Sequence, residues 1–154
     1  MDAEALQALV TFAAVYAALD AGHAAGDNWM QTDDQAANKD KPGWFGHWNC
    51  LKHVLGYGAT QLAALGVVVL VLDLRVSPMW LAIGMTLNLV THYVADRRAP
   101  LVWLAERLPV RKFVHLGEVR PGTDDQPHLG TGQHALDQSL HKCAFFATAV
   151  LSAL

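Results

Sequence analysis

The chain has 154 residues, of which 53% are hydrophobic and only 16% are charged, and its formal net charge is −3. This length fits a single domain, and the small net charge gives no reason to expect a nucleic acid partner. The two cysteines, Cys50 and Cys143, are too few for a disulfide framework or a thiolate metal site.

Charged residues are missing from two long stretches of the sequence. Residues 53–72 and 76–95 contain no Asp, Glu, Lys or Arg over 20 positions each, which is about the length that crosses a bilayer core of ~30 Å as a helix. Two further apolar segments, one near each end of the chain, carry few charges. We therefore expect an all-α fold in which residues 1–154 form a single integral membrane domain. Its four transmembrane helices should lie at about 5–27, 53–73, 78–96 and 134–154.

A soluble four-helix bundle is the alternative, because the mean hydropathy of the whole chain is only +0.20. Residues 59–72 argue against it, since they are apolar on every side, whereas a helix at the surface of a soluble protein keeps a polar face. The first apolar run is preceded by Asp2 and Glu4 rather than by basic residues. We therefore expect no cleavable signal peptide, and the first helix should stay in the mature protein.

The first predicted helix carries a polar stripe at its end. His23 and Asp27 are four residues apart, so they share one face of a helix. Asp20 lies one turn deeper and is predicted to support the same site, to relay protons, or to pair with a polar residue across the bundle. The connection that follows, residues 28–52, ends in an aromatic stretch from Trp44 to Trp48, which is typical of a belt at headgroup level.

The next two predicted helices repeat this pattern. The second helix begins with His53, followed at intervals of four by Tyr57 and Gln61. The third helix ends with His92 and Asp96, again four residues apart. Because one helix begins and the other ends at these residues, both stripes lie on the side of the membrane where the first stripe lies.

A long connection and a last helix complete the chain. Residues 101–108 combine apolar and charged positions and predict a short amphipathic helix on the membrane surface within the connection 97–133. The last helix carries His134, Asp137 and His141 within two turns of one face. The other histidines, His47, His115 and His128, lie outside these stripes and are expected at the surface or in structural contacts.

The distribution of Lys and Arg predicts the orientation. In a bundle of four spans the connections 28–52 and 97–133 share one side, and that side holds nearly all the basic residues, whereas the opposite side holds Arg75. Because basic residues mark the cytoplasmic face, we expect the site and both long loops in the cytoplasm of a bacterium and both termini outside its plasma membrane. Arg97, Arg98 and Lys142 would lie beside the site at headgroup level.

The acidic and histidine pairs predict a metal site. A charged group in the bilayer costs roughly 2.5–3.5 kcal/mol on insertion scales, so such groups face the bundle interior and mark function. A divalent cation would balance the carboxylates and bind the imidazole nitrogens. The predicted ligands of one or two ions are His23, Asp27, His92, Asp96, Asp137 and His141. Zn²⁺ suits this mixture best, and Mn²⁺ or Fe²⁺ also fit.

Several of these residues together resemble a known family. The segment from His23 to Thr32, then His53, the pair His92 and Asp96, and the closing Asp137-Gln138-Ser139-Leu140-His141 resemble a family of small bacterial and phage membrane proteins catalogued as domain of unknown function 3307. That family is distantly similar to membrane-bound metal-dependent hydrolases. The resemblance covers most of the chain except residues 100–130, and it implies metal-dependent hydrolysis without naming a substrate.

We therefore predict an integral membrane, metal-dependent hydrolase that acts on a lipid or a phosphoester at the cytoplasmic leaflet. A bound metal lowers the pKa of water and polarises the bond to be broken. The carboxylate of Asp27 or Asp96 would take the proton from that water, and His53 and His134 would be further ligands or acid and base groups. Two non-enzymatic alternatives remain: a proton or ion relay, and a phage-type membrane effector whose metal is structural.

Overall fold

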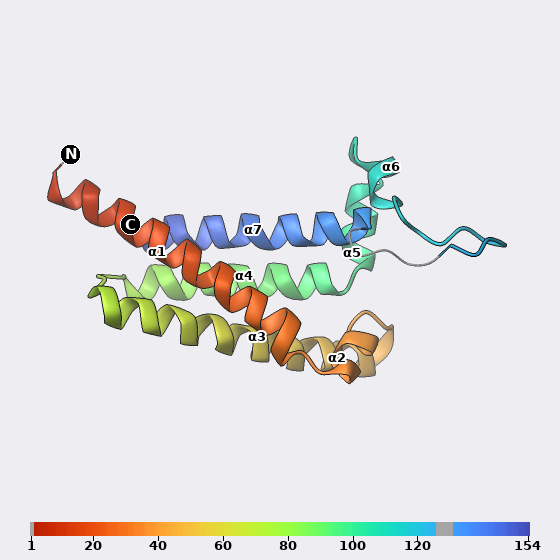
Figure 1. Cartoon of the computed structure of the whole chain (residues 1–154), viewed down its shortest axis with the longest axis horizontal. Helices are drawn as coiled ribbons and strands as arrows, with labels where there is room; N and C mark the ends of the chain where they lie inside the picture. The colour runs from red at the N-terminus through yellow and green to blue at the C-terminus, as the bar shows by residue number, and fades with distance from the viewer. Residues whose placement is uncertain (1, 126–130) are drawn as a thin grey trace.

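The computed structural model describes residues 2–125 and 131–154, and over these residues it is all-helical. Four long helices lie side by side and form a bundle (Figure 1). They are α1 (Ala3–Ala25), α3 (Gly43–Leu72), α4 (Pro78–Asp96) and α7 (Gly132–Ser152). Shorter elements occur at one end of the bundle: the π turn η1 (Gly26–Met30), α2 (Asp33–Asn38), α5 (Ala99–Ala105) and α6 (Arg111–Val114). The predicted all-α class is thereby confirmed.

The helix boundaries follow from local chemistry. The side chain of Asp2 accepts a hydrogen bond from the Ala5 amide and caps α1. Helix α4 begins at Pro78, which lacks an amide hydrogen and suits a first turn. Thr131 caps α7 by accepting from the amide of His134. Three of the four predicted long helices therefore agree with the structure to within a few residues.

The second long helix differs from the prediction at its start. Helix α3 begins at Gly43, directly after Pro42, and not near His53. Pro42 ends the preceding segment, and no proline occurs between it and His53, so the aromatic stretch from Trp44 to Trp48 forms the first turns of the helix instead of a loop. This extension makes α3 30 residues long, which exceeds what a bilayer core requires.

Two short helices were absent from the sequence prediction. Helix α2 is closed by a capping box in which Thr32 and Gln35 exchange side-chain and backbone hydrogen bonds. Helix α6 is a single turn. The predicted amphipathic helix is present as α5, although it spans Ala99–Ala105 and not residues 101–108.

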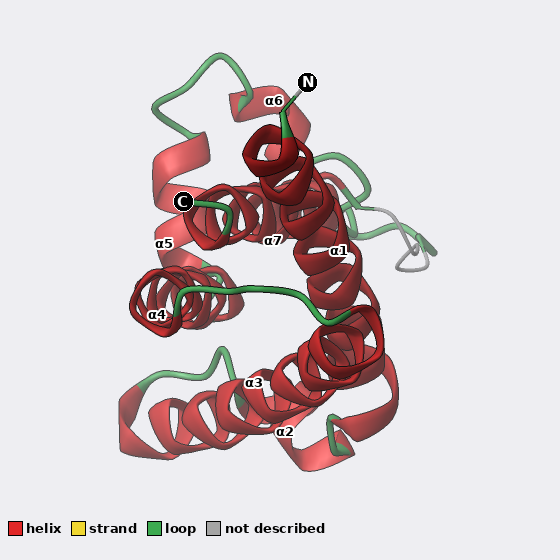
Figure 2. Cartoon of the chain, turned by 90° about the vertical axis from the view of Figure 1, so that its left-hand side faces the viewer, coloured by secondary structure: helices red, strands yellow, loops and turns green. Residues whose placement is uncertain are grey.

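Glycines allow the long helices to cross closely. A Cβ atom at Gly22 of α1 would lie 2.6 Å from Cα of Gln61 on α3, and a Cβ atom at Gly84 of α4 would lie 2.8 Å from the methyl group of Thr148 on α7. Small residues at such crossings bring helix backbones together, as in membrane bundles. The view along the bundle shows α1, α3, α4 and α7 packed around one interior (Figure 2).

Two of the four predicted spans are supported by length and hydropathy. Among the described residues, the segments Ala3–Met30 and Gly43–Leu72 are long and apolar enough to cross a membrane, and only 28% of each apolar window is buried. This fraction is far below that expected for the core helix of a soluble protein. Helices α4 and α7 do not pass the same test, because the polar residues of the predicted site, such as Asn88, His92 and Asp137, lower their hydropathy.

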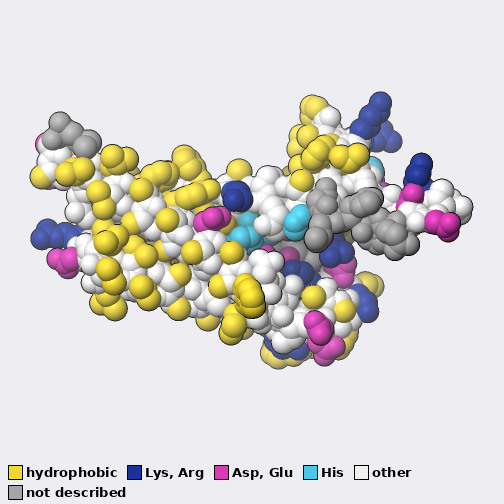
Figure 3. All heavy atoms as spheres, viewed as in Figure 1, with side chains coloured by type: hydrophobic (Ala, Val, Ile, Leu, Met, Phe, Trp, Pro, Cys, Tyr) yellow, Lys and Arg dark blue, Asp and Glu magenta, His cyan; other side chains and the backbone are white. Residues whose placement is uncertain are grey.

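The outer surface of the bundle is apolar on all four long helices. Leu70 of α3 is 83% exposed, Met79 of α4 is 60% exposed and Phe146 of α7 is 55% exposed. Figure 3 shows these apolar side chains covering most of the length of the bundle, whereas the charged groups gather mainly toward the end that carries α2, α5 and α6. The bundle is therefore apolar outside, and its interior contains the polar groups described next.

Candidate metal centre

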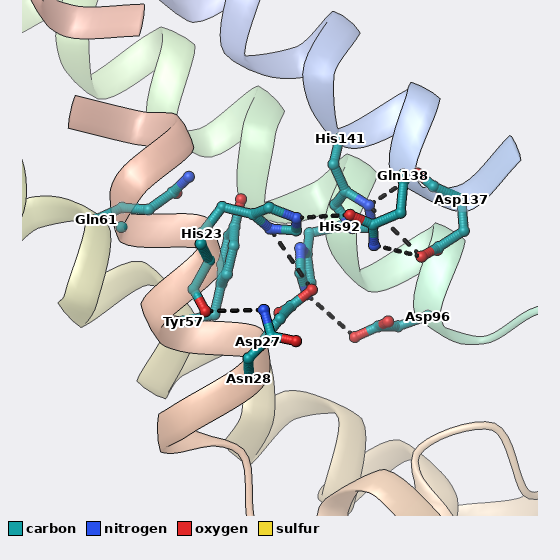
Figure 4. Close-up of polar contacts among 12 residues, drawn as sticks. His23, Asp27, Asn28, Tyr57, Gln61, His92, Asp96, Asp137, Gln138 and His141 are labelled. Carbon is teal, nitrogen blue, oxygen red and sulfur yellow. Dashed lines mark hydrogen bonds and ion pairs between the residues drawn. The ribbon is translucent and has the colours of Figure 1, made fainter. Parts of the chain in front are cut away.

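The six predicted ligands come together from three of the four long helices. His23 lies in α1 and Asp27 in the π turn that follows it, while His92 and Asp96 come from the end of α4. Asp137 and His141 lie in the first turns of α7. These side chains point toward one another (Figure 4), and the imidazoles of His92 and His141 are fully buried. The prediction that the polar stripes meet in one cluster is confirmed.

Four atoms converge most closely at the centre of the cluster. The Nε2 atoms of His53 and His92 are 3.0 Å apart. The Nε2 atom of His53 lies 3.2 Å from Oδ1 of Asp27 and 3.1 Å from Oδ2 of Asp96. The Nε2 atom of His92 lies 3.6 Å and 3.1 Å from the same two oxygens. We call this set of two imidazoles and two carboxylates the central quartet.

The distances from the two imidazole nitrogens to each other and to the two carboxylate oxygens, 3.0–3.6 Å, are close to the spacing of ligands around an ion. Metal to ligand distances of about 2.0–2.1 Å place neighbouring ligand atoms roughly 3.0–3.4 Å apart, depending on the coordination geometry. The oxygens Asp27 Oδ1 and Asp96 Oδ2 are buried and have no hydrogen-bond partner. The imidazole nitrogens of His53 and His92, at 3.1–3.6 Å, are their ion-pair partners. Buried polar atoms normally form well-directed hydrogen bonds, so a buried set of carboxylate oxygens and imidazole nitrogens that lacks them could hold a cation.

Two further histidines flank the quartet, each with one ring nitrogen held in place. The Nδ1 atom of His141 donates to the backbone oxygen of Asp137 at 2.8 Å, which leaves its buried Nε2 without a partner. Gln138 donates its Nε2 to Asp137 and accepts from Nε2 of His23 at 3.0 Å. The free Nδ1 of His23 then faces Asp27 at 3.5 Å. In each of these two rings a hydrogen bond holds one nitrogen and leaves the other facing the cluster, as in metal-bound histidines.

The cluster offers ligands for more than one ion. Three overlapping groups each have ligand atoms within 4.8 Å of one another: His23 with Asp27 and His92, His53 with His92 and Asp96, and Asp96 with Asp137 and His141. His92 belongs to the first two groups and Asp96 to the last two. A shared carboxylate between neighbouring groups is a common feature of two-metal sites.

A lysine that the sequence analysis did not include also reaches the site. Lys39, which follows α2, places its Nζ 2.7 Å from Oδ1 of Asp96. Arg97 holds this segment by donating to the backbone oxygens of Lys39 and Lys41, so it is not available to anchor headgroups as expected. The capping pattern from Thr32 to Gln35 was the sequence signal that could have located α2 and, with it, Lys39.

Uncharged polar groups connect the cluster to the interior of the bundle. The ring of Tyr57 stacks on His92, with ring centroids 3.7 Å apart, and its hydroxyl donates to Asn88. Asn88 donates to Gln61, which donates to the backbone oxygen of Leu19. These hydrogen bonds form a continuous series from Tyr57 to the backbone of α1. Because Tyr57 is held by this series and stacks on His92, the position of the His92 ring is fixed.

A pocket of about 710 Å³ opens beside the cluster at the polar end of the bundle. Asp27, Asp96 and Asp137 lie on its wall, together with the cations Lys39 and Arg98. Arg98 also forms an ion pair with Asp40 at 3.0 Å. The pocket therefore gives a ligand access to the carboxylate side of the cluster, next to positive charge.

Some predicted residues lie elsewhere. His134 lines the pocket but is exposed and is not part of the ligand groups. Asp20 faces outward and pairs with Lys142 at 3.4 Å across α1 and α7. This contact confirms the expectation that Asp20 pairs with a polar residue across the bundle. His47 and His115 are exposed, as expected, with His47 bonded to Tyr93. His128 lies outside the described residues.

No family model, curated protein or solved structure matches the chain. The resemblance to domain of unknown function 3307, and the hydrolysis that it implies, therefore remain predictions.

Proposed function

We propose that this protein is an integral membrane, metal-dependent hydrolase that acts on a lipid or a phosphoester. The observation that carries the proposal is the central quartet, where two buried carboxylate oxygens without hydrogen-bond partners face two imidazole nitrogens. The bound metal is one or two divalent ions, Zn²⁺ first, with Mn²⁺ or Fe²⁺ as alternatives.

All four long helices cross the membrane in this proposal, including α4 and α7. The support is the exposed apolar surface of the bundle, which continues over α4 at Ile83 and Val90 and over α7 at Phe146 and Val150. Buried polar groups lie inside, and this distribution is the opposite of that in a soluble bundle. The polar residues that lower the hydropathy of α4 and α7 face the interior, so they add little cost to insertion.

The site would open toward the cytoplasm of a bacterium, and both chain termini would lie outside its plasma membrane. The support is that the pocket, Lys39 and Arg98 lie at the end of the bundle where most of the basic residues gather, whereas Arg75 lies in the connection at the other end. Basic residues favour the cytoplasmic side.

The chain's own residues divide the chemical work. A divalent ion held there supplies a bound water of lowered pKa and polarises the bond to be broken. The quartet carboxylates of Asp27 and Asp96 face the ion position, so we assign proton transfer to the pocket residues beside them, Asp137 and His134. Lys39 and Arg98 hold an anionic substrate group against the carboxylate side of the cluster.

A transmembrane proton relay is less well supported. Among the described residues, the buried polar side chains toward the other end of the bundle are Thr11, Thr148 and Ser152. None of these side chains is ionisable, and the last two donate to backbone oxygens of their own or a neighbouring helix. A relay requires ionisable groups that continue toward the far surface.

The test is the metal content of detergent-purified protein, measured by elemental mass spectrometry. We expect stoichiometric metal in the wild type and its loss when Asp27→Asn and Asp96→Asn are combined. Asp20→Asn is the matched control, because Asp20 is a carboxylate of the same helical segment that faces outward. Hydrolysis of phosphoester and phospholipid substrates should be lost together with the metal.

Absence of metal from well-folded wild-type protein, even after reconstitution with Zn²⁺, Mn²⁺ and Fe²⁺, would contradict the proposal. Metal that is bound without any hydrolysis, in a protein whose biological effect survives the double substitution, would favour the membrane effector with a structural ion.

A further inference from the structure

A short helical arm projects sideways from the bundle at the end that carries the site. The arm consists of residues 99–119 and includes α5 and α6. It begins where Arg98 adopts a positive φ of 54°, which ends α4 and turns the chain. Figure 1 shows the arm lying across the direction of the long helices. Its position and composition are unexplained by the metal centre.

The arm is held firmly on the bundle. Leu101, Ala105 and Val114 are buried, and the amide of Gly132, at the start of α7, donates to the backbone oxygen of Leu116 at 2.7 Å. A Cβ atom at Gly132 would lie 1.6 Å from the backbone oxygen of Phe113. Because this contact admits only glycine, the arm keeps a defined orientation relative to the long helices.

Most of the remaining apolar side chains of the arm are exposed. Trp103 is 57% exposed and Leu116 is 58% exposed, and Leu104, Leu108, Phe113 and Val119 are also exposed. In Figure 3 the apolar atoms of this region lie on the side that faces the apolar length of the bundle, and Lys and Arg atoms lie on the far side. An element with this division lies in a membrane interface, with its apolar side toward the acyl chains.

The charges of the arm favour an anionic surface. Arg107, Arg111 and Lys112 are exposed, and the guanidinium of Arg107 lies 3.9 Å from the ring centre of Trp103. The two acidic groups, Glu106 and Glu118, both contact His115. The hydrogen bond between His115 and Glu118 raises the pKa of that imidazole, which further reduces the negative charge of the arm.

Tryptophans elsewhere at this end of the bundle provide an independent indication. Trp29 in the π turn is 85% exposed, and Trp44 and Trp48 at the start of α3 are 78% and 48% exposed. Exposed tryptophans that gather at one end of a helical bundle are typical of the boundary between acyl chains and water. They surround the site end on elements other than the arm.

We propose that the arm lies flat on the anionic lipid surface of the leaflet and sets the depth of the pocket mouth at the headgroups. The inference rests on the membrane placement in the proposed function and deepens it. Arg98 and Leu101, at the base of the arm, line the pocket. The substrate that reaches the metal centre is therefore the phosphate group of a membrane lipid and not a soluble phosphoester.

The experiment compares spin labels at two neighbouring positions of the arm in the full-length protein. Phe113→Cys and Lys112→Cys are each introduced together with Cys143→Ser, because Cys143 is exposed whereas Cys50 is buried. The labelled proteins are reconstituted in nanodiscs of phosphatidylcholine with or without phosphatidylglycerol. Collision with oxygen reports exposure to acyl chains, and collision with a polar nickel complex reports exposure to water.

We expect the label at position 113 to collide mainly with oxygen and the label at position 112 mainly with the nickel complex. Adding phosphatidylglycerol should increase the oxygen accessibility at position 113, and this increase should disappear when Arg107→Glu and Arg111→Glu are combined. Equal, high accessibility of both labels to the nickel complex would overturn the proposal, because the arm would then lie in water.

The outcome is separable from that of the metal centre, because the labels are read in metal-free protein. If the labels show that the arm lies in water while the protein still binds metal, a soluble phosphoester would remain as the substrate. If the labels place the arm at the lipid surface but the protein binds no metal, the membrane placement would be supported and the hydrolase proposal would be contradicted.

Discussion

The two ends of the bundle satisfy their buried polar groups in different ways. Toward the end that carries the chain termini, Val15, Leu65 and Met85 belong to an apolar core, and the hydroxyls of Thr148 and Ser152 donate to backbone oxygens. At the site end, oxygens of Asp27 and Asp96 are buried without hydrogen-bond partners. The hydroxyls at the first end have backbone partners, whereas the groups at the second end could hold a cation, so substitutions at the two ends should affect different properties.

The largest expected effect is the loss of metal binding in Asp96→Asn. This carboxylate belongs to two of the three ligand groups, and even the loss of an outer hydrogen-bond partner of a metal ligand costs roughly 10–100-fold in affinity. We therefore expect Zn²⁺ affinity to fall by more than about 100-fold in isothermal titration calorimetry. Ser152→Ala, at the other end, should retain wild-type affinity, and equal affinities of the two variants would contradict the division between the ends.

Leu65→Ala is expected to lower the free energy of unfolding without changing metal affinity. Leu65 is only 2% exposed, and truncation leaves a cavity whose cost is at the low end of the usual range, about 2 kcal/mol, because the hydrophobic transfer term is small in a bilayer. Unfolding in mixed detergent micelles, followed by circular dichroism, measures this loss. Leu70→Ala is the control, since Leu70 is 83% exposed, and metal affinity should be unchanged in both variants.

An intermediate effect is expected for Gln138→Leu. The Gln138 side chain joins Asp137 to His23 and keeps the hydrogen of His23 on Nε2. Without it, His23 loses its preferred tautomer, and metal affinity should fall by about 10–100-fold. Nitrogen NMR of labelled histidine would report the tautomer directly. Ser139→Ala, an exposed neighbour, should alter neither quantity, and an unchanged His23 spectrum in Gln138→Leu would exclude this role.

The smallest expected effect is an increase in metal affinity, whereas the other substitutions near the site lower it. Lys39 competes with a cation for Asp96, so Lys39→Met should raise metal affinity by about fivefold, since even a surface ion pair contributes up to about 1 kcal/mol. The same substitution should weaken inhibition by inorganic phosphate, because a cation is lost from the pocket wall. Lys41→Met is the control. A decrease of both metal and phosphate affinity would assign a merely structural role to Lys39.

Helical spacing was sufficient to find the ligand pairs. His92 with Asp96 and Asp137 with His141 are four residues apart, and each pair lies on one face as predicted. The all-α class and the positions of α4 and α7 also followed from the absence of charges and from apolar length. The prediction of four spans went further than hydropathy supports, because only two of the long helices are apolar enough on average to cross a membrane.

The sequence by itself determined which residues share a helix face, but only the tertiary structure decided which faces meet. Asp20 and His134 each lie three residues before a cluster residue, which is also a helical spacing, yet Asp20 faces outward and His134 lies on the pocket wall. The close contacts at Gly22 and Gly84 set how α1 and α7 are rotated, and the π turn that carries Asp27 departs from the usual helical period. Lys39 reaches Asp96 through a packed segment 57 positions earlier in the chain, and local spacing contains no information about such a contact.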